Sequence, residues 1–131
     1  MASLFSRIIA GEIPCHKIAE NDEFYAFLDI NPVATGHVLV VPKQEIDYIF
    51  DIDDDVLGRM LAFAKRVARA QKAAIPSKRI GLTVIGLEVP HAHIHLIPMT
   101  QESDIYFGKG KLTPSQEELA VTAEKIRNEY K

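Results

Sequence analysis

The sequence is poor in cysteine and has neither a long apolar run nor an excess of basic residues, and each absence excludes a class of protein. Its single cysteine, Cys15, cannot close a disulfide within the chain. The first residues lack the basic segment and apolar core of a secretory signal. No apolar run approaches the ~18 residues that suggest a membrane span. These absences predict a cytoplasmic protein that does not enter a membrane.

The charge balance argues against a nucleic-acid partner. The chain holds 15 lysine and arginine residues against 18 acidic residues, and no basic cluster is available to neutralise a phosphate backbone. A free nucleotide is compatible with this balance. The length of 131 residues predicts one domain, residues 1–131, large enough to bury an apolar core.

The most informative stretch is a run of three histidines, His91, His93 and His95, with an apolar residue after each. In an extended chain alternate side chains share a face about 6.6 Å apart, because each residue rises about 3.3 Å. The imidazoles would then lie on one face and the apolar residues on the other. Each crowded imidazole needs partners for two nitrogens. This face therefore predicts a ligand, a metal or a reaction rather than a structural role.

The rest of the chain shows helical and strand patterns. Apolar spacing predicts helices over residues 3–10 and from the acidic cluster 51–55 to about 74, and strands over 17–20, 23–29, 37–42, 79–85 and the histidine run. A last helix is predicted with Thr113 as its N-cap, Pro114 at its first position and Gln116 closing a capping box. Residues 101–111 are expected to form an exposed loop in which the apolar trio 105–107 covers another part of the protein.

Two polar residues outside the histidine run have plain structural explanations on their own. Asp29 ends an apolar strand and would cap the turn into Asn31 and Pro32. His37 stands where a loop enters a nearly continuous apolar strand, and a histidine at such a position usually has no chemistry. Taken singly, neither residue predicts a site.

Considered as a set, four segments resemble the histidine triad (HIT) family of nucleotide-binding proteins. Residues 5–14 (FSRIIAGEIP) are similar to its opening segment, and residues 27–32 (FLDINP) and 36–43 (GHVLVVPK) to its second block. Residues 91–98 (HAHIHLIP) resemble the motif that names the family. A lone His-x-His pair would be weak, whereas three histidines with the Gly-His segment upstream form a specific pattern.

The resemblance implies an α+β fold, with an antiparallel sheet of about five strands, a long central helix and a C-terminal helix. It implies a homodimer with a nucleotide site on each subunit. It also implies an enzyme, a HIT-type nucleoside phosphoramidase or nucleotide hydrolase that cleaves a purine nucleotide conjugate, of AMP or GMP type, at its α-phosphate. A phosphoramidate, an acyl-adenylate and a dinucleoside polyphosphate remain open as substrates.

The resemblance also implies roles for individual residues. His93 would be the nucleophile that forms a covalent nucleotidyl-histidine. His91 and His95 would contact phosphate oxygens and help to protonate the leaving group, with His37 in support. Asp29 would bind the ribose hydroxyls, in place of the capping role given above. Five apolar residues would enclose the base: Phe5, Ile8, Phe27, Leu28 and Ile30. Because a neutral imidazole is a competent nucleophile near pH 7, the scheme requires no metal and no cofactor.

The sequence departs from the family pattern in two places. Ser3 and Ser6 stand where many members have cysteines that help to bind zinc, so no zinc is expected there. Leu87 and Glu88 stand where a glutamine and a hydroxyl residue commonly contact the phosphates. A carboxylate at this position would repel a phosphate unless it were protonated or turned away. We expect this change to affect the cleavage rate and the leaving-group preference more than nucleotide binding.

Two other functions fit parts of the pattern. Three histidines on one strand, with His37 as a further ligand, could bind zinc, iron or copper, although two long helices leave too little chain for a complete β-barrel. A non-catalytic nucleotide sensor would keep the pocket and tolerate the changes at residues 87 and 88. Metal content and cleavage of a nucleotide conjugate distinguish these functions from the hydrolase.

Overall fold

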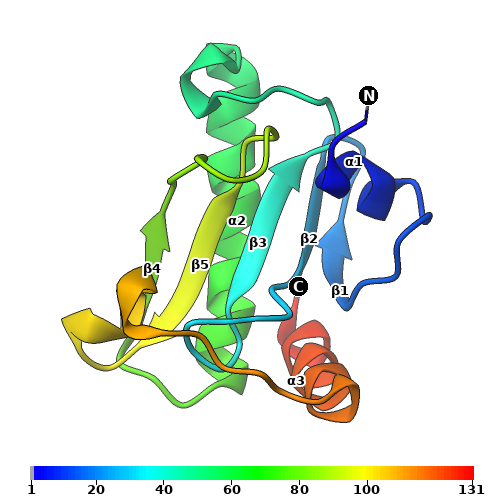
Figure 1. The fold of residues 1–131 in the computed structure, drawn as a ribbon. Coiled ribbons are helices and arrows are strands. Elements are labelled where there is room, and N and C mark those ends of the chain that lie inside the picture. The colour runs from blue at the N-terminus through cyan, green and yellow to red at the C-terminus, as the bar shows by residue number, and fades with distance from the viewer. Residues whose placement is uncertain (1) are drawn as a thin grey trace.

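A five-stranded antiparallel sheet forms the centre of the protein (Figure 1). The structure is a computed structural model and describes residues 2–131. The strands are β1 (Lys17–Glu20), β2 (Phe24–Leu28), β3 (Val38–Pro42), β4 (Arg79–Thr83) and β5 (Ile94–Met99). They lie in the order β1-β2-β3-β5-β4, and every neighbouring pair is antiparallel. Within the described chain, β1 and β4 are therefore the edge strands.

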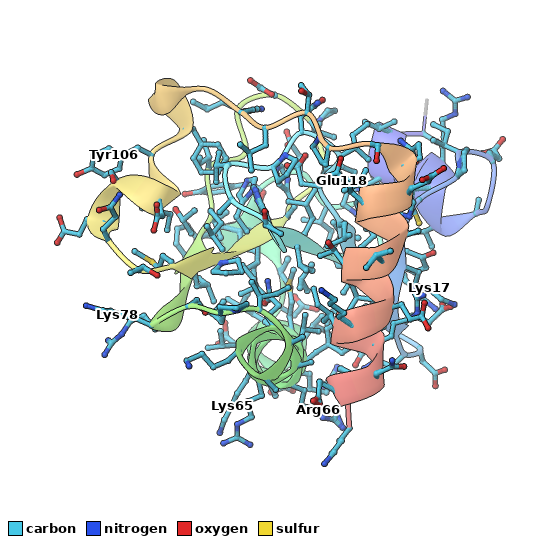
Figure 2. All side chains as sticks on the ribbon, turned by 90° about the horizontal axis from the view of Figure 1, so that it is seen from below. Lys17, Lys65, Arg66, Lys78, Tyr106 and Glu118 are labelled. Carbon is cyan, nitrogen blue, oxygen red and sulfur yellow. The ribbon has the colours of Figure 1, made fainter. Side chains whose placement is uncertain are left out.

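Helices cover both faces of this sheet. The α-helices are α1 (Leu4–Ile9), α2 (Asp54–Ala74) and α3 (Gln116–Glu129), and short 3-10 turns occur at Ile49–Asp51, Glu102–Ile105 and Phe107–Lys109. In Figure 1 the long helix α2 lies behind the sheet, and α3 packs against α2, β1 and β2. Figure 2 shows α2 end-on, with Lys65 and Arg66 pointing away from the sheet. None of the helices in residues 2–131 combines the length and the apolar character needed to cross a bilayer.

The pleat of the strands separates two sets of side chains. On the α2 face the main core includes residues from β2, β3 and β5: Phe24, Ala26, Leu28, Val38, Val40, Ile94 and Leu96. On the opposite face a smaller cluster joins α1 to β2 and β3: Phe5, Ile8, Tyr25, Phe27, Leu39 and Val41. Because successive strand residues alternate between faces, His93 and His95 lie on the side of α1 and not on the side of α2.

The predicted α+β fold is confirmed, with corrections at element ends. The last helix begins at Gln116, and its capping box joins Ser115 to Glu118 rather than Thr113 to Gln116. The carboxylate of Glu118 is a better partner for a helix N-terminus than a neutral amide, because the helix dipole is positive there. Strand β4 ends at Thr83, and β5 begins at Ile94, after a bend at His91.

Candidate active site

The histidines that the sequence singled out are buried together on the α1 face. His93, His95 and His37 form a continuous row, with ring centroids 4.8 Å apart for His93 and His95 and 5.1 Å apart for His95 and His37. His91 lies beyond the ring of Phe5, whose centroid is 5.8 Å from that of His91 and 4.9 Å from that of His93. All four imidazoles are at most 7% exposed. The fold therefore gathers them into one site.

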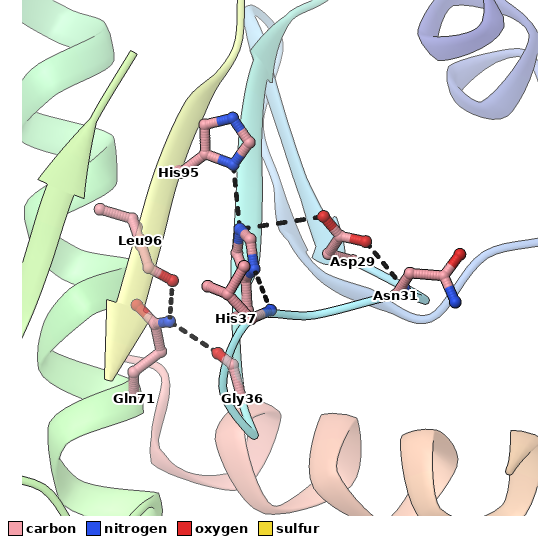
Figure 3. Close-up of polar contacts among 8 residues, drawn as sticks. Asp29, Asn31, Gly36, His37, Gln71, His95 and Leu96 are labelled. Carbon is pink, nitrogen blue, oxygen red and sulfur yellow. Dashed lines mark hydrogen bonds and ion pairs between the residues drawn. The ribbon is translucent and has the colours of Figure 1, made fainter. Parts of the chain in front are cut away.

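Gly36 and Gln71 place the ends of the strands that carry this row (Figure 3). Gly36 has a φ of 88°, and a Cβ there would stand 2.9 Å from Cγ1 of Ile75, so the turn into β3 requires glycine. Nε2 of Gln71, on α2, donates to the carbonyl oxygens of Gly36 at 2.8 Å and Leu96 at 2.9 Å. One buried amide thus holds together the segments that carry His37 and His95.

Hydrogen bonds set the tautomers of His91 and His93. Nε2 of His91 lies 2.8 Å from the carbonyl oxygen of Pro42, which can only accept, so this nitrogen carries the proton. Nδ1 of His93 donates in the same way to the carbonyl oxygen of His91 at 2.8 Å. In its neutral form His93 therefore keeps an unprotonated Nε2, the lone pair that nucleophilic attack requires.

The other two rings are oriented by a second set of bonds (Figure 3). The backbone N–H of Val33 donates to Nδ1 of His37 at 3.2 Å. Nε2 of His37 consequently carries the proton and donates to Nδ1 of His95 at 2.9 Å. His95 must then hold its own proton on Nε2. The site thus pairs an unprotonated nitrogen on His93 with a neighbouring N–H on His95.

Burial favours the neutral form of His37, His95 and His91. Removal from water is the main cause, and repulsion from neighbouring imidazoles a smaller one, of a pKa lowered to about 3 for His37 and to about 4 for His95. Burial also lowers the pKa of His91, against an opposing hydrogen bond to Pro42. Neutral rings agree with the tautomers above, because a protonated imidazole would need an acceptor at both nitrogens.

Asp29 lies beside this row at the end of β2. Its Oδ2 is 3.9 Å from Nε2 of His37, and its Oδ1 accepts from the backbone N–H of Asn31 at 2.9 Å. Burial raises the pKa of this carboxyl above its ordinary value, with a smaller opposing effect from the bond to Asn31. The side chain is 19% exposed and can therefore still be reached by a ligand. It also lines a cavity of about 270 Å³ that extends from His37 towards α3.

The five apolar residues expected to enclose a base are only partly brought together. Phe5, Ile8 and Phe27 share one cluster, and the rings of Phe5 and Phe27 meet edge to face with centroids 5.6 Å apart. Leu28 belongs to the core on the α2 face, and Ile30 is 54% exposed. The first three form an apolar wall next to His93.

Two residues that shape the site, Phe107 and Gln71, were not recognised from the sequence. The ring of Phe107 stands edge-on to His95 and His37, with centroids 4.8 Å and 6.0 Å away, so within the apolar trio 105–107 it is Phe107 that covers the histidines. Gln71 continues the buried spacing of α2 after Met60 and Val67. A polar residue on that apolar stripe was the available signal.

The stretch that departs from the family pattern lies close to the site. Leu87 is 88% exposed and Glu88 is also exposed. The charge of Glu88 has the smallest of the effects on the pKa of Asp29 and acts to raise it. Ser3 lies 2.7 Å from Nδ1 of His91.

Among the side chains that the structure describes, one set could approach a single metal ion. Atoms of Asp29, His37 and His95 all lie within 4.8 Å of one another. The tautomers oppose this use, because Nε2 of His37 carries a proton while its Nδ1 accepts from Val33. A metal on Nε2 would move that proton to Nδ1, where it would face the Val33 N–H. The donor set therefore fits a proton network better than a metal.

Comparison with known proteins places this geometry in context. A model of the HIT domain matches residues 10–102. An adenosine 5'-monophosphoramidase of Schizosaccharomyces pombe is 34% identical over 139 aligned positions that cover 100% of both chains. An enzyme of the same name from Saccharomyces cerevisiae is 40% identical over 102 residues, covering 77% of this chain and 65% of that one.

A solved structure is similar over nearly the whole chain. It is a HIT-like protein involved in cell-cycle regulation from Bartonella henselae, with a TM-score of 0.85 and 30% sequence identity. The match covers 97% of this chain and 95% of the other. The similarity therefore includes the sheet, α2 and α3.

Proposed function

This chain belongs to the HIT domain family, and from that premise we propose that it is a nucleotide hydrolase or transferase acting at the α-phosphate of a purine nucleotide conjugate. The names of the two yeast relatives favour a nucleoside phosphoramidate such as adenosine 5'-phosphoramidate. Acyl-adenylates and dinucleoside polyphosphates present the same phosphorus atom and belong to the same proposal. The substrate class thus rests on relatives, and the chemistry rests on the site.

The observation that carries the proposal is the pair of opposite proton states on adjacent rings. His93 has its Nδ1–H fixed on the carbonyl oxygen of His91 and its Nε2 free of a proton. His95, with its ring centroid 4.8 Å away, holds a proton on Nε2 because its Nδ1 accepts from His37. A nucleophile beside an N–H that can donate to a phosphate oxygen is what displacement at phosphorus needs.

The reaction then proceeds in two displacements. Nε2 of His93 attacks the α-phosphorus and the bond to the leaving group breaks, while the Nε2–H of His95 donates a hydrogen bond to a phosphate oxygen. An amine leaving group departs with the proton that its nitrogen already carried in the bound substrate, and a carboxylate or phosphate departs as the anion. The nucleotidyl-imidazolium keeps its Nδ1–H on the carbonyl oxygen of His91. Water then attacks the same phosphorus, the P–N bond to His93 breaks to release the nucleoside monophosphate and the neutral ring, and the proton lost by the water passes to solvent. His91 and His37 hold the two reacting rings and stay neutral.

The nucleoside would lie between the row and α1. Asp29 would accept hydrogen bonds from the ribose diol, and Phe5, Ile8 and Phe27 would form the apolar wall for the base. The roles of Leu28 and Ile30 remain predictions. Leu28 would act by packing beneath the site, because its side chain belongs to the main core.

The non-catalytic nucleotide sensor is a second candidate, favoured by one observation. Glu88 follows Leu87 in the stretch before the histidines and raises the pKa of Asp29 weakly, and a carboxylate that approached the phosphates would oppose negative charge that develops in the transition state. Such a protein would bind nucleoside monophosphates and turn over slowly. The metal-binding alternative is disfavoured by the tautomer of His37.

The remaining predictions concern assembly, extent and location. A homodimer through β4 is supported by an apolar groove of about 470 Å³ between β4 and α2, lined by residues that include Leu61 and Leu82. We also propose one domain over residues 1–131, since α3, outside the matched range 10–102, packs on the same core; Met1 lies outside the described residues. The cytoplasmic location and the absence of nucleic-acid and membrane partners stay predictions.

A panel of the three conjugate classes tests the function directly. Wild type should cleave at least one of them, and His93→Ala should abolish cleavage while binding the nucleoside monophosphate with similar affinity. His16→Ala is the matched control, because His16 bonds Gln116 on α3 and lies outside the row. Cleavage unchanged in His93→Ala would overturn the mechanism. Binding without cleavage by wild type would support the sensor.

A further inference from the structure

A carboxylate outside the histidine row is tied to it through two serines. Oε1 of Glu45, in the loop after β3, accepts from the backbone N–H of Ser3 at 2.5 Å and from Oγ of Ser6 at 2.7 Å. Oγ of Ser3 lies 2.7 Å from Nδ1 of His91. The backbone N–H of Ser6 donates to the same Ser3 hydroxyl at 3.1 Å, which makes Ser3 the N-cap of α1.

The direction of each bond follows from the tautomer of His91. Because Nε2 of His91 donates to Pro42, its Nδ1 can only accept in the neutral ring. The Ser3 hydroxyl therefore donates to His91, and the Ser6 hydroxyl donates to Glu45. In this cluster, defined as Ser3, Ser6 and Glu45, both hydroxyls and both backbone N–H groups of the serines then have an acceptor. The two bonds from the serines also lower the pKa of Glu45 to about 2, so the carboxylate is ionised at neutral pH.

The cluster fixes two parts of the site at once. It holds the ring of His91. The backbone carbonyl oxygen of His91 in turn accepts from Nδ1 of His93. It also anchors α1, a helix of six residues that carries Phe5 against both His91 and His93. A helix this short has little stability of its own and depends on such tertiary contacts. Loosening Glu45 would therefore free the ring of His91 and the ring of Phe5, and His93 would lose its fixed orientation.

We propose that Glu45 is a positioning residue for the reaction proposed above, acting through Ser3 and Ser6 on His91 and, through the His91 carbonyl, on the orientation of His93. The inference rests on that proposed function. Glu45 touches neither the reacting atoms nor His93, and its part is to supply an oxygen that accepts two hydrogen bonds. Glutamine can supply such an oxygen, whereas alanine cannot.

The test compares Glu45→Ala, Glu45→Gln and Ser6→Ala with wild type, using Glu124→Ala on the exposed side of α3 as the matched control. kcat and KM are measured with adenosine 5'-phosphoramidate, and imidazole nitrogens of the free proteins are observed by long-range 1H–15N NMR. Hydrogen bonds to a charged group are worth enough for Glu45→Ala to lower kcat by about tenfold or more. Glu45→Gln should stay within about threefold of wild type, because it restores the acceptor.

The NMR spectra give a readout that does not need turnover. In Glu45→Ala the His91 Nδ1 resonance should move as the Ser3 bond loosens, and in Glu45→Gln and Glu124→Ala it should stay in place. Ser6→Ala should show a smaller change in the same direction, which keeps the test valid if Glu45→Ala folds poorly.

Two results would overturn the inference alone. One is an active wild type with unchanged kcat and His91 resonances in Glu45→Ala, and the other is equal loss of kcat in the alanine and glutamine variants. A wild type that cleaves none of the conjugates would instead overturn the proposed function, and with it any positioning role in that reaction.

Discussion

Nε2 of His37 lies 2.9 Å from Nδ1 of His95, and this single bond decides where the proton of each ring resides. His37 is committed as donor because Val33 occupies its other nitrogen. His95 is consequently left with a proton on the nitrogen that does not face His37. The chemistry proposed for the site depends on this arrangement staying neutral at working pH.

The first prediction concerns stability against pH. Burial holds the pKa of His37 at about 3 and that of His95 at about 4, against an ordinary value of 6.5. The unfolded state therefore binds more protons below pH 6.5, and the free energy of unfolding should fall as pH drops from about 6.5 towards 4. Each ring contributes up to about 1.4 kcal/mol per pH unit in that window. Asp29, whose pKa is raised, has the opposite effect: its contribution to the free energy of unfolding increases as the pH falls at the acidic end of this range.

Urea unfolding at a series of pH values measures this slope. His37→Asn should reduce it, whereas His16→Ala, which leaves the buried pair intact, should not. A wild-type slope of zero between pH 4 and 6.5 would mean that the buried rings titrate as they do in the unfolded chain.

The second prediction concerns Gln71. Gln71→Met keeps the length of the side chain and removes both bonds to the carbonyl oxygens of Gly36 and Leu96. At about 1 kcal/mol per bond, unfolding should become easier by about 2 kcal/mol, measured by denaturant unfolding. Gln44→Met, at an exposed position, is the control and should change little. Equal stability of the two variants would show that the amide clamp contributes nothing.

The third prediction concerns Phe107. Phe107→Ala should admit water to His95, and the pKa of His95 should rise from about 4 towards its ordinary value, because burial is the main cause of its depression. Titration of the imidazole resonances by NMR measures this change. Tyr106→Ala removes the neighbouring aromatic ring, which is 54% exposed, and should leave His95 unchanged. If the pKa of His95 did not change in Phe107→Ala, residues other than Phe107 would be responsible for its burial.

The fourth prediction concerns assembly. Leu82 on the edge strand β4 is 47% exposed and lines the apolar groove, and charge on an edge strand opposes pairing with another chain. Light scattering should give a dimer for wild type and a monomer for Leu82→Lys. Val121→Lys on α3, also at an exposed apolar position, should remain a dimer. A monomeric wild type would contradict the homodimer.

Local patterns in the sequence were sufficient to predict most of the fold. Alternation within β2 and β5 and helical spacing in α2 predicted those elements, because they report which face is buried. Leu61 is an apolar residue of α2, yet it is 55% exposed and lines the groove beside β4. Periodicity shows that a side chain is apolar, but not whether the core or a surface groove receives it.

The site was less predictable where it depends on long-range contacts. Histidine spacing indicated the row, but the partners of its rings come from distant segments. Phe107 reaches His37 from 70 positions further along the chain, and Glu45 reaches Ser3 across 42. No local pattern encodes such contacts, because each exists only after the sheet has formed.

The most direct test of the central claim is to trap the covalent intermediate. Wild type would be mixed with adenosine 5'-phosphoramidate, quenched in milliseconds at alkaline pH, digested and mapped by mass spectrometry. A nucleotidyl group should be found on His93, and it should form and decay at rates consistent with turnover. Cleavage that proceeds with no adduct, or with the adduct on His95 instead, would contradict the assignment of His93 as the nucleophile.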